Sequence, residues 1–123
     1  MKYLGMDFGL KRVGLAQSEG ELATPWKVIE GRGINDLLEK IKKVALEFDY
    51  IIIGMPEGKI GEIVKRVARD LRESGLDVEE ADETLSSQHA TALMVELNIP
   101  KKKRKINDDI SAAEILQNWL DNR

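Results

Sequence analysis

A short apolar strand between two amphipathic helices is the feature that most restricts how this chain can fold. Residues 50–53 are strand-forming and almost entirely apolar, and they end at Gly54, as is typical of a strand buried on both faces of a parallel sheet. Apolar residues at helical spacing over 34–47 and 60–71 predict a helix on either side of it. Because strand-helix-strand units close with right-handed crossovers, the chain after residue 30 is expected to form the parallel half of a sheet.

The first thirty residues have a different pattern. Residues 2–8, 11–17 and 23–30 are predicted strands joined by short turns at Gly9 and Gly20, which indicates an antiparallel meander. Later in the chain we expect a short fifth strand at 76–80 and helices at about 85–97 and 109–121. The predicted fold is an α/β domain with one mixed five-stranded sheet and helices on both faces. Its length of 123 residues fits a single domain over 1–123.

Composition excludes several kinds of protein and site. The charged content of 33% argues against a membrane protein, and the N-terminus lacks a secretory signal, so a cytoplasmic location is expected. With no cysteine and one histidine, His89, thiolate and histidine-rich metal sites are excluded within one chain. Any metal must therefore be bound mainly by carboxylates. The net charge of −3 argues against a uniformly basic nucleic-acid-binding coat, although local basic patches remain compatible with it.

Asp7 breaks the apolar pattern of the first strand. Asp is depleted inside strands, and this one lies two residues from Gly5 on one side and two from Gly9 on the other. Glycines there would leave bare backbone beside a carboxylate that holds a cation, so that a bulky anion could approach. A carboxylate that caps the hairpin turn is the alternative.

Two further acidic positions follow predicted elements. Asp82 and Glu83 come directly after the fifth strand, at the carboxyl end where open α/β sheets bind ligands, although a solvated acidic turn is equally compatible. Asp109 is at the start of a helix and shares a face with its apolar stripe at 112, 113, 116 and 120, so it is expected to point toward the sheet. The adjacent Asp108 is expected to be the more solvated of the two.

Basic residues are concentrated immediately before that helix. A phosphate backbone would be attracted to this run and to the basic pair Lys11 and Arg12, although such runs are often only solvated loops. The run consists of Lys101, Lys102, Lys103, Arg104 and Lys105.

Carboxylates on three separate elements favour a hard divalent ion. Asp7, either Asp82 or Glu83, and Asp109 could converge in this fold, and without histidine such a cluster is typical of Mg²⁺ or Mn²⁺. Two ions about 3.5 to 4 Å apart would activate water against a phosphodiester, which predicts a nuclease. Because the charges repel one another, at least one carboxylate pKa in the metal-free cluster is expected to be raised.

Four motifs in this order resemble those of the YqgF/RuvX family, a group of pre-16S ribosomal RNA nucleases and Holliday junction resolvases in the ribonuclease H-like superfamily. They cover nearly the whole chain: DFGLKRVGLAQSE at 7–19, IIIGMPEGKIG at 51–61, DETLSSQHA at 82–90 and DISAAEILQNWL at 109–120. The resemblance implies the ribonuclease H-like mixed sheet. It also implies an acidic triad at Asp7, Glu83 and Asp109, and backbone contacts from Lys11 and Arg12.

The sequence departs from the family pattern at three positions. Glu19, Thr84 and Glu62 stand where the family usually has Asp, Arg and Ser. The missing cation beside Glu83 would remove a phosphate contact, so the grip on substrate is expected to differ.

The leading hypothesis is therefore a Mg²⁺- or Mn²⁺-dependent endonuclease that processes the 5′ end of pre-16S ribosomal RNA. Resolution of four-way DNA is the alternative at the same site, and it requires two cuts and hence a homodimer. From other classes come a non-catalytic nucleic-acid-binding protein and a nucleotide-phosphate-binding module. The latter is suggested by residues 7–14, which also resemble the phosphate loop of actin-like kinases, but the chain is too short for a second lobe.

Overall fold

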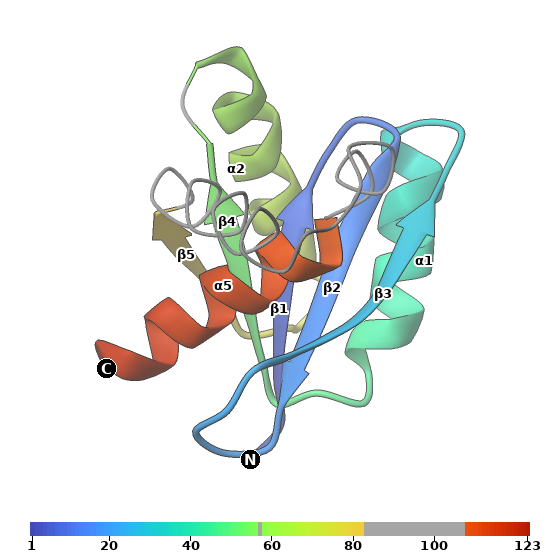
Figure 1. The fold of residues 1–123 in the computed structure, drawn as a ribbon. Helices are drawn as coiled ribbons and strands as arrows, with labels where there is room; N and C mark the ends of the chain where they lie inside the picture. Colours follow the sequence, from blue (N-terminus) through green and yellow to red (C-terminus); the bar gives the residue numbers. More distant parts are fainter. Residues whose placement is uncertain (57, 83–107) are drawn as a thin grey trace.

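A five-stranded mixed sheet organises the molecule, as predicted (Figure 1). The computed structural model describes residues 1–56, 58–82 and 108–123. The helix predicted at 85–97 lies outside these residues. The strands are β1 (Tyr3–Phe8), β2 (Arg12–Ser18), β3 (Thr24–Glu30), β4 (Tyr50–Met55) and β5 (Val78–Asp82). The helices in the described part are α1 (Ile34–Ala45), α2 (Lys59–Glu73) and α5 (Asp108–Asp121).

The sheet order is β3-β2-β1-β4-β5, which places β1 at the centre. β1, β2 and β3 pair antiparallel as the predicted meander, whereas β4 pairs parallel with both β1 and β5. The carboxyl ends of β1, β4 and β5 therefore lie at one edge of the sheet. The parallel half inferred from the buried strand at 50–53 is confirmed.

The fifth strand begins two residues later than predicted. Leu76 belongs to the turn that ends α2, because its N–H donates to the carbonyl of Leu71 at 3.2 Å. Strand pairing starts only where Val78 lies opposite Ile51. Asp82 is consequently the last residue of the strand, paired with Met55, and does not follow the strand as expected.

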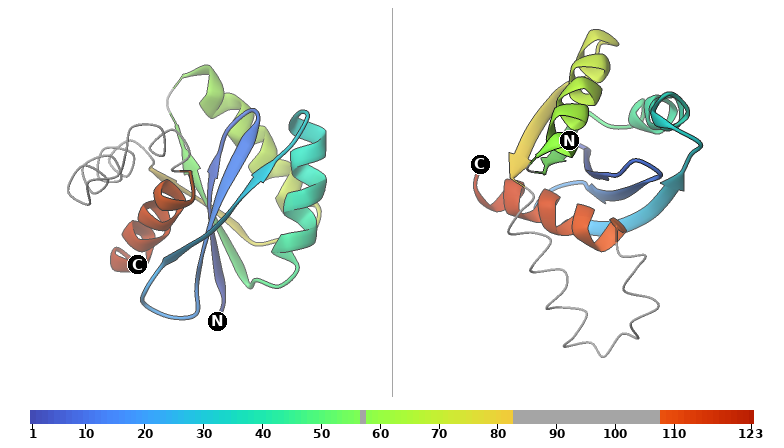
Figure 2. Two further views of the ribbon diagram at one scale, coloured as in Figure 1. Left: turned by 45° about the vertical axis from the view of Figure 1, so that its right-hand side comes forward. Right: turned by 90° about the horizontal axis from the view of Figure 1, so that it is seen from above.

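Helices cover both faces of the sheet. Figure 2 shows α1 and α2 on one side and α5 on the other. The core beneath α1 and α2 includes Leu4, Met6 and Phe8 of β1, whereas the core beneath α5 includes Tyr3 of the same strand. Because side chains alternate along a strand, Asp7 belongs to the face that α5 covers.

The absence of side chains at two glycines lets α5 approach the sheet closely. A Cβ atom placed on Gly5 would lie 2.7 Å from the Cβ of Leu116, and one on Gly14 would lie within 2.6 Å of the Cβ of Asp108. The interpretation of Gly5 as bare backbone for a ligand is therefore wrong, because α5 fills that space. Gly9 suits the tight turn in which its N–H donates to the Arg12 carbonyl at 2.8 Å, because a Cβ atom there would lie 2.9 Å from the same carbonyl oxygen.

Polar contacts hold the other end of α5 in place. The side-chain oxygen of Gln117 accepts a hydrogen bond from the N–H of Ala23 at 2.8 Å, and its nitrogen donates to the carbonyl of Glu21 at 2.9 Å. The indole N–H of Trp119 donates to Glu79 at 2.7 Å. With both ends set against the sheet, the position of the first turn of α5 is fixed relative to β1.

Candidate active site

Asp7 and Asp108 meet at the carboxyl edge of the central strand. Asp7 lies opposite Gly14 in the pairing of β1 with β2. A Cβ atom at Gly14 would lie only 1.9 Å from the carbonyl oxygen of Asp108. Because Gly14 has no side chain, the start of α5 rests directly on β2, beside Asp7. The packing of α5 on β2 at Gly14 thus brings together two carboxylates that are 101 positions apart in the sequence (108 − 7).

Asp108 also contacts a cation from the β1–β2 hairpin. The Arg12 Nε atom lies 3.4 Å from Asp108 Oδ2, and the two side chains are 38% and 25% exposed. A half-exposed ion pair of this kind adds little to stability. The ion pair matters for the geometry of the site, because it holds the first residue of α5 against the hairpin that follows Asp7.

The pKa of Asp108 is raised, chiefly because burial disfavours the charged carboxylate. The neighbouring charge of Asp7 raises it further, the Arg12 guanidinium lowers it, and Asp109 adds a smaller rise. A raised pKa was predicted for one of Asp7, Glu83 and Asp109; the raised pKa belongs to Asp108, which was not in that predicted cluster, and repulsion from Asp7 is only its second cause. Two like charges held together in this way favour the binding of a proton or a cation.

The expected contrast between the two adjacent aspartates is not seen. Both Asp108 and Asp109 are partly buried, so burial does not single out Asp108 as the more solvated residue. The Oδ1 atom of Asp109 accepts a hydrogen bond from the N–H of Ile110 at 3.0 Å, within the first turn of its own helix. The buried face of α5 also contains Ser111 and Ile115, which lie on the Asp108 side.

The two carboxylates open into a cavity of about 320 Å³. Lys11 and Arg12, which were predicted to contact a nucleic-acid backbone, also line it, so the structure places both predicted cations beside the acidic pair. The remaining lining residues are Gly9, Leu10 and Ile60. The sequence analysis did not identify Leu10 and Ile60 as site residues, because Leu10 is an isolated apolar residue in a turn and Ile60 was used only as the first residue of the apolar helical pattern over 60–71.

Other predicted site residues, Glu83 and the basic run at 101–105, lie outside the described residues. The single histidine, His89, which was not predicted to be a site residue, lies outside them as well. Within the described residues, no group of three His, Cys, Asp or Glu side chains is arranged to hold a metal ion. The donor set nevertheless fits a hard ion, because Mg²⁺ is commonly bound by one or two carboxylates, with water and substrate phosphates completing its shell.

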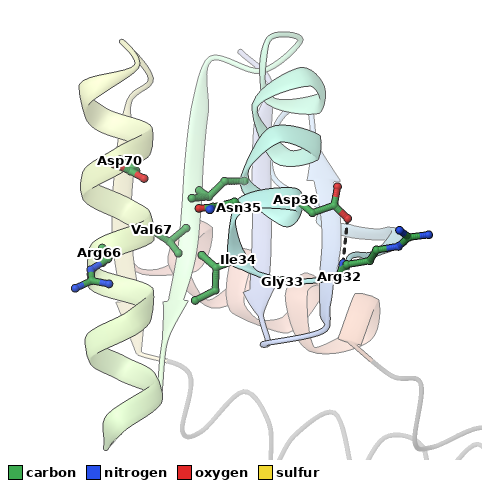
Figure 3. Close-up of a pocket in the computed structure, with 9 residues that line it drawn as sticks. Arg32, Gly33, Ile34, Asn35, Asp36, Arg66, Val67 and Asp70 are labelled. Atoms are coloured by element: carbon green, nitrogen blue, oxygen red, sulfur yellow. Dashed lines mark hydrogen bonds between the residues drawn. The ribbon is translucent and has the colours of Figure 1, made fainter.

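A larger cavity, of about 500 Å³, lies elsewhere, between α1 and α2 (Figure 3). Ile34 and Val67 face each other across it, and Arg66 and Asp70 lie along its α2 side. The carboxylate of Asp36 accepts a hydrogen bond from the backbone N–H of Arg32 at 3.0 Å. This cavity shares no residue with the one at Asp7, and the hydrogen bond from Arg32 lowers the pKa of its Asp36 carboxyl, so its size does not make it the reactive site.

Two solved structures of resolvases have a similar fold. The fowlpox virus Holliday junction resolvase matches with a TM-score of 0.61 and 12% identity, covering 99% of each chain. T. thermophilus RuvC in complex with a Holliday junction substrate matches with a TM-score of 0.55 and 15% identity, covering 94% of this chain and 91% of that one. At such identity the likeness establishes the fold alone, which is of the ribonuclease H-like type.

Sequence comparison identifies the family. The family model RuvX, described as Holliday junction resolvase, matches residues 1–122. A protein of Bacillus cereus named "Putative pre-16S rRNA nuclease" is 33% identical over 138 aligned positions, which cover 100% of both chains. The chain belongs to the RuvX family, and the resemblance inferred from its four motifs is confirmed.

None of the helices in the described ranges has the length and apolar character needed to cross a membrane.

Proposed function

We propose that this protein is a divalent-metal-dependent endonuclease that cleaves structured nucleic acid, with the 5′ leader of pre-16S ribosomal RNA as its substrate. Membership of the RuvX family supports a hydrolase acting on nucleic acid, and the name of the Bacillus cereus relative favours ribosomal RNA. Residues 1–123 would act as a single nuclease domain.

One observation carries the mechanism: the start of α5 brings Asp108 beside Asp7 in a cavity that also contains Lys11 and Arg12. Asp7 and Asp108 would hold Mg²⁺ or Mn²⁺, with Glu83 as the third carboxylate. Asp109, the residue predicted from the apolar stripe, remains the alternative to Asp108. The bound ions would supply a nucleophilic water and stabilise the leaving oxygen of the phosphodiester.

The surrounding residues have supporting roles in this proposal. Lys11 and Arg12 would bind phosphates on either side of the cut, since such contacts fix the register of a nucleic acid without reading its sequence. The basic run at 101–105 would extend this contact. When a metal is bound, the repulsion between the two aspartates is relieved, so the raised pKa of Asp108 would fall.

Resolution of four-way DNA junctions is the second candidate. The description of the family model and the resolvase folds of the structural neighbours support it. The same carboxylates would cut the phosphodiester. Two symmetric cuts require paired active sites, so this function also requires a homodimer.

A cleavage assay with both substrates tests the proposal. Purified protein is incubated with a labelled pre-16S leader RNA or a labelled four-way DNA junction, each in EDTA, Mg²⁺ or Mn²⁺. We expect cutting of the RNA in Mg²⁺ or Mn²⁺ and none in EDTA, because the carboxylates alone cannot activate water.

The outcomes separate the candidates. Paired cuts in the junction, with the RNA left intact, would replace the leading function by the second one. Binding of both substrates without cleavage in any metal would reject the nuclease and favour a non-catalytic nucleic-acid-binding protein.

A further inference from the structure

Two large apolar side chains are exposed beside the acidic pair. Leu10 is 47% exposed and Ile60 is 42% exposed, and both line the cavity that contains Asp7 and Asp108. Exposed apolar residues scattered singly over a surface need no explanation. Two exposed apolar side chains that line the same charged cavity do need an explanation, because neither can contribute to metal binding or to phosphate contacts.

The backbone presents these side chains from two separate elements. Leu10 lies in the hairpin between β1 and β2, whose turn is closed by the hydrogen bond between Gly9 and Arg12. Ile60 lies in the first turn of α2, on the same face as Val64 and Val67, which pack into the core further along the helix. Both are thus held on ordered backbone next to the carboxylates.

The chemistry of a nucleic acid suggests what such side chains contact. Its phosphates would lie against Lys11 and Arg12, whereas the faces of its bases are apolar. Leu and Ile are among the side chains that insert between bases and unstack them. In a regular duplex each base face is covered by its neighbours, so contact with Leu10 and Ile60 requires a base that is unpaired or unstacked.

We propose that Leu10 and Ile60 contact an unstacked nucleobase next to the scissile phosphate and thereby select substrates with an unpaired or distorted step. The inference rests on the proposed function of the same cavity and names its substrate class. Charge attracts any phosphate backbone to Lys11 and Arg12, whereas the apolar pair distinguishes a distorted strand from a regular one.

Binding without cleavage tests this selection. Fluorescence anisotropy in EDTA compares a labelled RNA duplex that is fully paired with the same duplex carrying a one-nucleotide bulge. We expect the wild type to bind the bulged duplex about tenfold more tightly, which corresponds to about 1.4 kcal/mol and is on the scale of burying one aliphatic side chain. The double variant Leu10→Ala/Ile60→Ala should lose this preference to within about twofold and keep its affinity for the paired duplex, because only the contact with an unstacked base is removed.

The chain offers a matched control. Leu22 and Leu46 are 72% and 78% exposed and lie outside the acidic cavity. Leu22→Ala/Leu46→Ala removes comparable apolar surface and should leave the preference unchanged. The conservative variant Leu10→Met/Ile60→Leu should also retain it, because its side chains still offer apolar contact.

Three results would overturn the inference. The first is a wild type that binds both duplexes equally. The second is a double alanine variant that keeps the preference for the bulge. The third is a melting temperature of that variant well below that of the Leu22→Ala/Leu46→Ala control, since it would mean that protein, not nucleic acid, covers the two side chains. Because the assay needs no cleavage, a preference that is lost only in the alanine variant supports the base contact even if the protein fails to cut.

Discussion

Replacement of Asp7 by asparagine is expected to abolish nucleic-acid cleavage while leaving binding intact. Asparagine preserves the size of the side chain but removes the negative charge that would bind the metal. Loss of residues that only support metal ligands typically costs 10- to 100-fold, so loss of a ligand should lower the rate by at least about 100-fold. Affinity for RNA in EDTA should be unchanged or higher, because one negative charge facing the phosphates is gone.

The matched control for this variant is Asp70→Asn. Asp70 is a partly buried carboxylate on α2 that lines the other cavity, and its replacement should leave the cleavage rate within about twofold of wild type, as is typical of residues away from the site. Rates are compared in Mn²⁺ with the labelled RNA. An Asp7→Asn enzyme that cuts at the wild-type rate would contradict the assignment of Asp7 as a metal ligand.

Gly14→Ala is expected to have the second large effect, on both stability and activity. The new methyl group would lie 1.9 Å from the carbonyl oxygen of Asp108, so the start of α5 must move away from β2. Inserting a methyl group into a packed interior typically costs about 1 to 3 kcal/mol. We expect the melting temperature to fall by several degrees. The cleavage rate should fall as well, because Asp108 moves with the helix away from Asp7.

Gly20→Ala provides the comparison, since nothing lies within 4 Å of a Cβ atom placed there. Thermal melting and cleavage of both variants are measured under the same conditions. If Gly14→Ala melts and cuts like Gly20→Ala, the close approach of α5 to β2 is not what positions Asp108.

The fold was largely predictable because its signals are local. The buried run at 50–53, the helical spacing over 34–47 and 60–71, and the turn glycines each specify an element without reference to the rest of the chain. The predicted boundaries of these elements lie within one or two residues of those observed in the structure. The fifth strand was misplaced by two residues because Leu76, an apolar residue, ends a helical turn rather than beginning a strand.

The site was predictable only in part, because its geometry depends on packing between distant segments. Apolar spacing favoured Asp109 over Asp108, but the buried face of α5 also contains Ser111 and Ile115, on the Asp108 side of the predicted stripe. The position of α5 depends on Gly5 and Gly14, because the absence of side chains there leaves room for Leu116 and Asp108. Such a contact between segments about 100 positions apart leaves no periodic signal in either of them.

Titration of Mn²⁺ into four proteins by calorimetry tests the central claim, that Asp7 and Asp108 together hold the metal. The proteins are the wild type, Asp7→Asn, Asp108→Asn and Asp109→Asn. Affinity should fall at least about tenfold in Asp7→Asn and in Asp108→Asn, whereas Asp109→Asn should bind like the wild type. Wild-type affinity should also fall as the pH is lowered, because protons compete with the metal for Asp108, whose pKa is raised. A wild type that binds no Mn²⁺, or a loss confined to Asp7→Asn and Asp109→Asn, would contradict this account of the site.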